Sequence, residues 1–345
     1  MGELMSIILE YSFFTCLLLF LNFFMLKKGI FLDVPVAHSH KNQIFFSKKV
    51  PKSLGLIILL FIFYKINITV IEKFFIFSVY FLGFQSDINK LNSPKIRILT
   101  QFLIVLIFLI FSKSYINSTR IPFIDNFLLN DIFKISLTLV CIIIVINGSN
   151  FIDGLNTLCI GYYLGIFLFL NFMIFNNYDY PHLKEEILYL SLFILILYFF
   201  NLFGFSFLGD SGSYLLGFFT SYSLVRFHNL LPDVSPWLIA NLLWYPAFEI
   251  LFSIVRRFKK TYNPLLPDNQ HLHQIIYIYL KNLLPYKKYI LNPLTANIIN
   301  TYNYFIFFLS CYFYKNTKYL VCLFLFSCFV YIMSYLFFSS HLKKN

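Results

Sequence analysis

Three aspartates stand where long apolar runs end, and they give the strongest chemical signal in this sequence. Asp87, Asp153 and Asp210 each have Gly and either Asn or Ser close by. If the apolar runs cross a membrane, carboxylates at their ends are costly unless they are paired, hydrated or bound to a cation. Oxygen ligands of this kind suit Mg²⁺, which also bridges phosphates. Helix capping by each aspartate is the alternative, but three similar surroundings favour a metal site.

The neighbours of these aspartates have types and spacings that suit a polar ligand. Asn147, Asn150 and Asp153 are three residues apart, so a helix would place them along one face. The glycines around Asp210 fit a tight turn into a following helix, whose first backbone N–H groups can bind an anion. These features predict a rim for a polar ligand.

The longest polar interval runs from Arg256 to about residue 300 and holds two of the seven histidines. His271 and His273 are two residues apart, so they would not share a helix face, and an extended loop would be needed for both to contact one ligand. Both are suitable phosphate donors. Zinc is less favoured, because no cysteine or third histidine lies near by. Arg256 and Arg257 fit a membrane anchor or a weaker phosphate contact.

The composition requires that these residues be positioned by membrane helices. The chain has 345 residues, of which 59% are hydrophobic and 12% are charged, whereas soluble domains carry about 25% charged residues. A soluble globular fold and a disordered chain are therefore both excluded. The net charge of +12 reflects basic loops at a membrane surface rather than nucleic-acid binding.

The hydropathy pattern predicts an all-α polytopic membrane protein with ten or eleven transmembrane helices, since about 20 apolar residues cross a bilayer. The first run is expected to be a retained helix rather than a cleaved signal. The runs lie near 6–26, 54–71, 74–85, 98–112, 132–149, 158–175, 187–206, 212–225, 235–255, 302–314 and 319–338. We expect a single domain over 1–345, with a motif-bearing core at about 30–275 and a C-terminal helical pair at about 302–338.

Roughly two thirds of the 27 Lys and Arg residues fall in loops on one side if the N-terminus lies outside. Positive residues favour the cytoplasmic side. The predicted orientation therefore has the N-terminus outside, the C-terminus in the cytoplasm and the aspartates at the cytoplasmic face.

Taken together, these segments resemble the polyprenyl-phosphate N-acetylhexosamine-1-phosphate transferases, which form glycosyltransferase family 4. The resemblance covers roughly residues 30–275, in the family's order, and its His-x-His form is similar to the GlcNAc-type branch. The segments that carry it are Gly83-Phe84-Gln85-Ser86-Asp87 with Gln101, Asn147 to Asn156, Phe207 to Ser213, Pro246-Ala247-Phe248-Glu249, Arg256-Arg257, and Pro267-Asp268 to His273.

The resemblance implies a phosphoglycosyltransferase that moves phospho-N-acetylhexosamine from a UDP-sugar, by default UDP-GlcNAc, to undecaprenyl phosphate and releases UMP. This would be the first membrane step of a surface polysaccharide pathway such as O-antigen or cell-wall synthesis, in the bacterial inner membrane. It implies Mg²⁺, with Mn²⁺ as a substitute, and a homodimer. Asp87 and Asp210 would be catalytic, and Asp210, Asp87 and Asp153 would hold the metal. The implied substrate-binding residues are Asn147, Asn150, Asp153, Asn156, Asn201, Phe207 (stacking on uracil), Arg256, Arg257, His271 and His273.

The sequence departs from the family pattern at several positions. Ser86 stands where the first aspartate of a pair is usual, Asn156 stands where a second aspartate usually follows Asp153-Gly154, and Gln274 replaces a further histidine. His38 and Ser39 replace a basic pair, and Asn201 lies one residue closer to Asp210 than the pattern has it. Two alternatives therefore stay open: a non-catalytic relative that binds polyprenyl phosphate, and a transporter of lipid-linked sugars.

Overall fold

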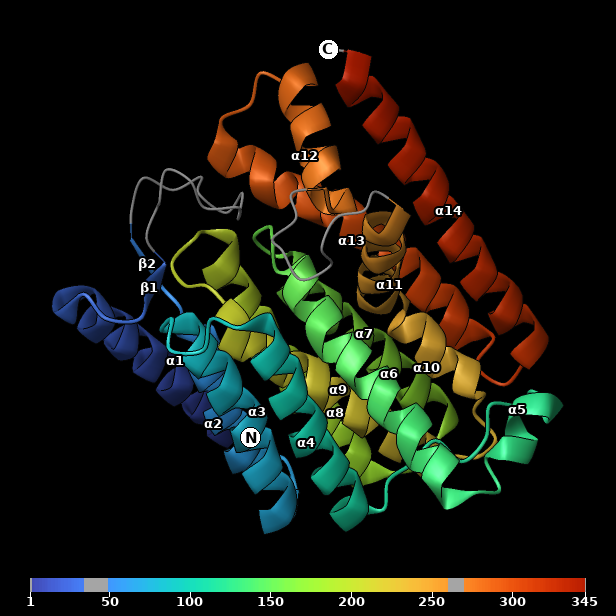
Figure 1. The fold of residues 1–345 in the computed structure, drawn as a ribbon. Helices are drawn as coiled ribbons and strands as arrows, with labels where there is room; N and C mark the ends of the chain where they lie inside the picture. The colour runs from blue at the N-terminus through green and yellow to red at the C-terminus, as the bar shows by residue number, and fades with distance from the viewer. Residues whose placement is uncertain (1, 34–48, 260–269, 345) are drawn as a thin grey trace.

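The computed structural model describes residues 2–33, 49–259 and 270–344, and these form fourteen helices and one two-stranded β pair (Figure 1). The predicted segments with Pro35, His38 and Ser39 and with Pro267 and Asp268 lie outside these residues. The elements are α1 (Gly2–Lys28), β1 (Leu32–Asp33), β2 (Val50–Pro51), α2 (Leu54–Lys65), α3 (Val70–Asp87), α4 (Pro94–Ser112), α5 (Pro122–Phe127), α6 (Asp131–Ile152), α7 (Leu158–Asn177), α8 (Pro181–Leu202), α9 (Gly209–Leu230), α10 (Pro236–Leu242), α11 (Trp244–Lys259), α12 (Leu272–Leu283), α13 (Lys288–Tyr312) and α14 (Thr317–Lys344).

The predicted all-α polytopic class is confirmed, although the number of spans differs. Six of the described helices are long and apolar enough to cross a membrane, namely α1, α4, α6, α7, α8 and α14. A seventh span results if α10 and α11, bent by 68° at their junction, are counted as one. This is fewer than the ten or eleven expected, because α2 has only 12 residues and because α3, α9 and α13 carry polar residues among their apolar ones.

Helix α9 forms the centre of the bundle and is buried over most of its length. It packs against α3, α6 and α2 (Figure 1). Two glycines make this contact close at its first turn. A Cβ on Gly83 of α3 would lie 2.5 Å from Ser211 Cα, and one on Gly55 of α2 would lie 2.7 Å from Gly212 Cα. Larger side chains at either position would push the helices apart, so these glycines fix where α9 begins.

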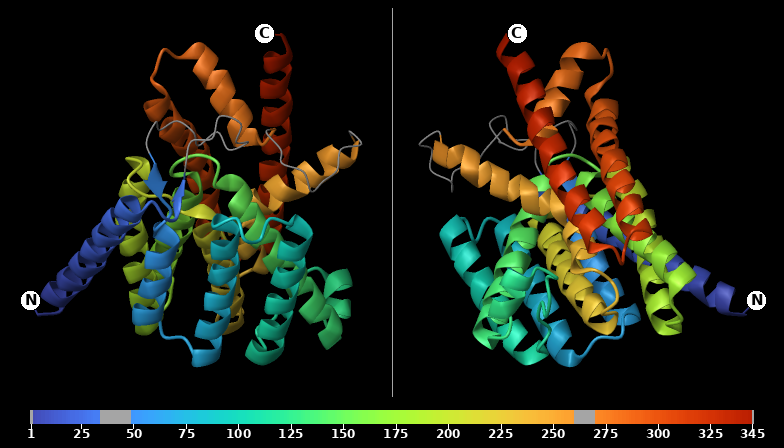
Figure 2. Two further views of the ribbon diagram at one scale, coloured as in Figure 1. Left: turned by 60° about the vertical axis from the view of Figure 1, so that its left-hand side comes forward. Right: turned by 90° about the vertical axis from the view of Figure 1, so that its right-hand side faces the viewer.

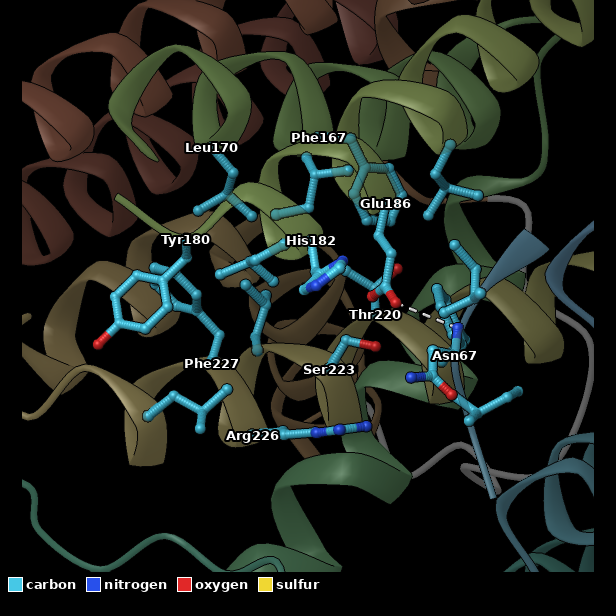
Figure 3. A pocket seen from close by; sticks show the side chains of 18 of the residues that line it. Asn67, Phe167, Leu170, Tyr180, His182, Glu186, Thr220, Ser223, Arg226 and Phe227 are labelled. Carbon is cyan, nitrogen blue, oxygen red and sulfur yellow. Dashed lines mark hydrogen bonds between the residues drawn. The ribbon is translucent and has the colours of Figure 1, made fainter. Parts of the chain in front are cut away.

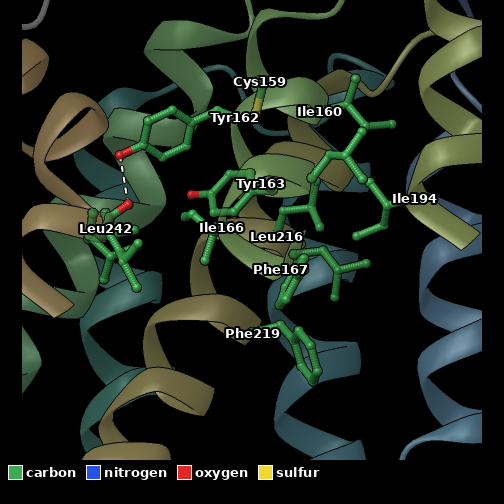
Figure 4. Packing of buried hydrophobic residues seen from close by; sticks show 14 of the residues in the cluster. Cys159, Ile160, Tyr162, Tyr163, Ile166, Phe167, Ile194, Leu216, Phe219 and Leu242 are labelled. Carbon is green, nitrogen blue, oxygen red and sulfur yellow. Dashed lines mark hydrogen bonds between the residues drawn. The ribbon is translucent and has the colours of Figure 1, made fainter. Parts of the chain in front are cut away.

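The hydrophobic core continues around α7, whose buried aromatic residues pack against α9 and α10 (Figure 4). Tyr162 donates a hydrogen bond to the carbonyl of Leu242 at 2.7 Å, and Tyr163 hydrogen-bonds to Ser149. Burying a tyrosine requires such a partner for its hydroxyl. These bonds join α7 to α6 and to the end of α10.

The outer helices present apolar side chains to the surroundings, as a membrane protein requires. Phe20 and Phe23 on α1 and Phe329 on α14 are more than half exposed. Figure 2 shows α1 and α14 on the outside of the bundle, with α12 and the C-terminal end of α14 projecting beyond the other helices. The β pair lies on this same side of the molecule.

The small β pair was not expected from the sequence. Leu32 pairs with Pro51 and Asp33 with Val50 in antiparallel register. The N–H of Phe207 donates to the carbonyl of Pro51 at 2.8 Å. The pair therefore connects the start of α2 to the segment that leads into α9.

Candidate active site

Asp87 and Asp210 are neighbours, although 122 residues separate them in the sequence. Asp87 ends α3, and its carboxylate accepts hydrogen bonds from the backbone N–H groups of Asp210 (3.1 Å) and Ser211 (2.9 Å) at the start of α9. A carboxylate in this position satisfies free N–H groups and interacts favourably with the helix dipole. Lys52 lies 3.1 Å from the same carboxylate. Asp87 therefore caps α9 and carries a cationic partner.

Asp210 is the point at which four elements meet. Its Oδ2 accepts a hydrogen bond from Ser86 at 2.6 Å, and its Oδ1 accepts one from the Asn150 amide at 2.7 Å. The guanidinium of Arg97 lies 3.3 Å from Oδ2 and also donates to the Ser86 hydroxyl at 2.8 Å. Asp210 is only 7% exposed, so these partners provide the compensation that a buried carboxylate requires.

Gly209 makes the approach of Asp87 to α9 possible. Its φ is +70°, which L side chains rarely adopt, and a Cβ would lie 2.8 Å from Asp87 Oδ2. We expect Gly209→Ala to lower the free energy of unfolding, both by the cost of about 1–2 kcal/mol for a left-handed residue and by displacing Asp87. Thermal unfolding in detergent checks this.

Gly29→Ala is the matched control for that substitution. Gly29 has a similar φ of +67°, but nothing lies within 4 Å of a Cβ built there. It should show the backbone cost alone, so equal losses in the two variants would contradict the role of Gly209 in seating Asp87.

Lys52 and Arg97 were not predicted as site residues, because the sequence presented them only as basic residues of inner loops. The positions of both residues in the sequence could nonetheless have indicated a role in the site. Arg97 lies between the Ser86-Asp87 segment and Gln101, in the first turn of the next helix. Lys52 directly follows β2.

The polar residues that were predicted to share one face of α6 contact two different helices. Asn150 contacts Asp210, whereas the Asn147 amide donates to Gln101 of α4 at 2.7 Å. Asp153 is the C-cap residue of α6 and is 9% exposed. Among the described residues there is no group of three His, Cys, Asp or Glu side chains arranged to hold a metal ion. The three-aspartate metal site stays a prediction, and the structure brings two of its members, Asp87 and Asp210, together.

The histidines lie against the other side of the end of α6. The ring of His271 contacts Phe151 at 4.8 Å between centroids, and its Nδ1 lies 2.9 Å from the buried carboxylate of Glu249. Tyr331 donates to the second oxygen of that carboxylate at 2.7 Å. The sequence presents Glu249 only as part of the segment Pro246-Ala247-Phe248-Glu249. In the structure it orients His271.

The expectation that both histidines lie in an extended loop is corrected in part. His271 has an extended backbone as the N-cap of α12, but His273 belongs to the first turn of that helix. Their rings are nevertheless nearly parallel, with centroids 5.7 Å apart. The extended N-cap conformation turns the His271 side chain back over the helix start, which is why residues two apart can meet.

His273 is fully buried, and neither ring nitrogen has a hydrogen-bond partner among the described residues. Its Nε2 lies against Gly154, where a Cβ would collide with the ring, so that glycine leaves room for the imidazole. Burial lowers the pKa of His273 to about 3. The imidazole is therefore neutral at ordinary pH and can serve as an uncharged hydrogen-bonding group.

This burial predicts a loss of stability in acid. Below pH 6.5 the unfolded chain protonates His273 while the folded chain does not, so the free energy of unfolding should fall by about 1.4 kcal/mol per pH unit until the folded pKa is reached. Unfolding in detergent between pH 7.5 and 4.5 would show this slope, and His273→Gln should reduce it. The exposed His341 offers the control variant His341→Gln, and an unchanged slope in His273→Gln would exclude this origin.

The other predicted substrate-binding residues have partners within the protein. Asn201 accepts from the N–H of Thr157 at 2.6 Å and donates to the carbonyl of Ser206 at 3.1 Å. Arg256 donates to the Gln270 carbonyl and to the Tyr335 hydroxyl, and Arg257 beside it is 8% exposed.

Asn156 and Phe207 are buried. The backbone N–H of Asn156 donates to the Asn292 side chain of α13 at 2.8 Å, and its own amide group has no partner among the residues described. Phe207 is 5% exposed, so its ring offers little surface to a nucleobase.

Fold and site together define a class: a helical membrane protein in which acidic, basic and amide side chains meet at one end of the bundle. Residues 71–228 match the family model described as glycosyl transferase family 4, which includes Asp87, Asn150, Asp153 and Asp210. The matched stretch is a little under half of the chain, and over it the chain is similar to this family.

Several similar proteins have names that agree with this match. Undecaprenyl-phosphate alpha-N-acetylglucosaminyl 1-phosphate transferase of Escherichia coli K12 is 26% identical over 199 residues, which are 53% of this chain and 52% of that protein. Decaprenyl-phosphate N-acetylglucosaminephosphotransferase of Mycolicibacterium smegmatis is 28% identical over 172 residues, 44% of this chain and 42% of that protein. The protein of Thermotoga maritima with the same name as the first is 40% identical over 70 residues, 20% and 22% of the two chains. The chain spans about half the length of the first of these relatives.

Proposed function

We propose that this protein transfers a sugar phosphate, GlcNAc-1-phosphate by preference, from a UDP-sugar to undecaprenyl phosphate. An oxygen of the lipid phosphate forms a bond to the β-phosphorus of the UDP-sugar. The bond from that phosphorus to the bridging oxygen breaks, and UMP leaves with the bond's electron pair. The product is a polyprenyl-diphospho-sugar, the starting point of a surface polysaccharide.

One observation carries this proposal: Asp87, Asp210, Asn150, Lys52 and Arg97 meet at the start of α9, within the stretch that matches the family model or beside it. Phosphoryl transfer needs placement and charge neutralisation rather than covalent chemistry by the protein. Lys52 and Arg97 supply positive charge for phosphate oxygens. A lipid phosphate has a second pKa of about 6 and is largely ionised near pH 7, so a separate strong base is unnecessary.

Asp210 and Asp87 are the residues that would hold Mg²⁺. Carboxylate oxygens are the ligands this ion prefers. Because Asp210 Oδ2 already faces Arg97, the ion would share this carboxylate with the guanidinium. When bound, the ion would neutralise the diphosphate as UMP leaves. Asp153, at the end of the same helix as Asn150, would contact the nucleotide side of the substrate.

The second cluster would bind the donor sugar or its diphosphate. His271 is oriented by Glu249, and His273 lies against Gly154, so both are positioned beside the segment that follows Asn150. Because most basic residues gather in loops at this end of the bundle, we place the site at the cytoplasmic face of the bacterial inner membrane.

Exchange of labelled UMP into UDP-GlcNAc by purified protein in the presence of undecaprenyl phosphate and Mg²⁺ is the sharpest test. It requires the reverse reaction, which a transporter or a binding protein does not perform. Ser86 and the ion pairs of both carboxylates favour a lipid-phosphate-binding relative as the second candidate. That candidate predicts retention of undecaprenyl phosphate without exchange of UMP.

A further inference from the structure

A cavity lies at the end of α9 that is far from Asp210, and Figure 3 shows side chains that line it. Its volume is about 310 Å³, and it is lined by the second half of α9, the first turns of α8, part of α7 and the residues between α2 and α3. Arg226, at its edge, is 16 residues beyond Asp210, which corresponds to about 24 Å along a helix. The cavity is therefore separate from the candidate active site.

Glu186 brings to this cavity a carboxylate that has no ion-pair partner within contact distance among the described residues. It accepts one hydrogen bond, from the backbone N–H of Asn67 at 3.1 Å, and no described Lys or Arg forms an ion pair with it. Arg226 is 3.5 Å from Glu72 instead, and Tyr222 also donates to Glu72. The two carboxylates, Glu72 and Glu186, outnumber the one guanidinium, and His182, which also lines the cavity, attracts Glu186. A carboxylate without an ion-pair partner of its own is costly near hydrocarbon unless a cation binds it.

Thr220 adds an unsatisfied hydroxyl to the same wall. It is fully buried, lines the cavity, and its Oγ1 has no hydrogen-bond partner among the described residues. A buried polar group without a partner costs about 1–3 kcal/mol. A ligand with a hydrogen-bonding head group would remove that cost.

The rest of the lining is apolar and aromatic, with Phe167, Leu170, Leu190, Phe219 and Phe227 as its largest contributors. A simple inorganic cation would leave this surface without a partner. A purely apolar ligand would leave Glu186 uncompensated. An anion would add to the negative charge already present.

We propose that this cavity binds an amphiphile that carries a primary ammonium group. The ammonium pairs with Glu186 and hydrogen-bonds to the Thr220 hydroxyl, while the apolar body lies against the Phe and Leu side chains. Both a lipid with an ethanolamine head group and a free long-chain amine have this chemistry.

Native mass spectrometry of the detergent-purified full chain tests the proposal. The probes are phosphatidylethanolamine, phosphatidylglycerol with the same acyl chains, dodecylamine and dodecanol. We expect at least one amine probe to bind about tenfold or more tightly than its amine-free counterpart. Preference for phosphatidylethanolamine alone identifies a lipid head group, and preference for dodecylamine alone identifies a free amine. Equal binding of both members of each pair would overturn the proposal.

Two variants locate the binding. Glu186→Gln keeps an acceptor for Asn67 but removes the charge, so the preference for amines should fall by about tenfold to a hundredfold. Glu185→Gln, on the exposed side of the same helix turn, should retain it. Thr220→Val should raise the unfolding temperature without ligand and weaken amine binding. A Glu186→Gln protein that keeps the wild-type preference would disprove the assignment.

Discussion

Replacing Asp210 with asparagine should reduce formation of lipid-linked sugar by about 10²–10³-fold, the loss typical of removing one electrostatic stabiliser from a reacting centre. Asp210 accepts from Ser86 and Asn150 and faces Arg97. Asparagine keeps one acceptor oxygen and the size of the side chain, but it cannot balance the guanidinium or hold a divalent cation. Incorporation of radiolabelled UDP-GlcNAc into butanol-extractable lipid measures the effect.

Asp131→Asn is the matched control for this change. Asp131 begins α6, at the opposite end of that helix from Asn150, and its side chain is 80% exposed. Its loss should leave activity unchanged. Unfolding temperatures of the two variants separate a chemical loss from a structural one. Full activity in a folded Asp210→Asn protein would remove Asp210 from the metal and catalytic assignment.

Replacing Arg97 with glutamine should also lower activity strongly, by about a hundredfold. The guanidinium contacts both Ser86 and Asp210, so its removal leaves a buried carboxylate without its nearest cation, which typically costs several kcal/mol. Arg97→Lys should recover part of the activity, because it restores the charge without the planar geometry of the guanidinium. Lys95→Gln, on the exposed side of the same helix turn, is the control.

Ser86 allows a sharper test of this pair. Restoring the usual acidic residue with Ser86→Asp should raise activity or leave it unchanged, since Arg97 can donate to both carboxylates. In the Ser86→Asp/Arg97→Gln double variant the two carboxylates would repel each other without a shared cation, and the combined loss should exceed that of Arg97→Gln alone. Complete loss in Ser86→Asp alone would mean that the site depends on the hydroxyl.

Local sequence was sufficient to predict the membrane class and the helices. Most apolar runs lie in a described helix, but the run near 54–71 covers α2, the connection after it and the start of α3, and the run near 235–255 is broken between α10 and α11. The start of α9 was also readable, because Gly209, Asp210 and Ser211 form a turn with its own composition. The short run at 212–225 proved to be the inner part of a 22-residue helix, since buried Gly and Ser lower the hydropathy without ending the helix.

Which side chains share a site depended on contacts between distant segments. The spacing of Asn147 and Asn150 suggested one common ligand, but α4 and α9 approach α6 from different sides and take one asparagine each. Asn201 is predicted from the sequence to bind substrate. In the structure its amide joins two backbone segments through hydrogen bonds to Thr157 and Ser206. The spacing of residues along one helix shows which side chains share a face. It does not show which other helix packs against that face.

The sequence by itself was sufficient to predict that this protein is helical and lies in a bilayer. It also showed that a few aspartates stand at the ends of the apolar runs. Only the tertiary structure decided that Asp87 caps the helix of Asp210, that Lys52 and Arg97 neutralise the pair, and that His273 is buried against Gly154. The physical reason is that hydropathy is a property of each segment, whereas these partnerships depend on how closely the helices pack. Gly55 and Gly83 set that distance at α9.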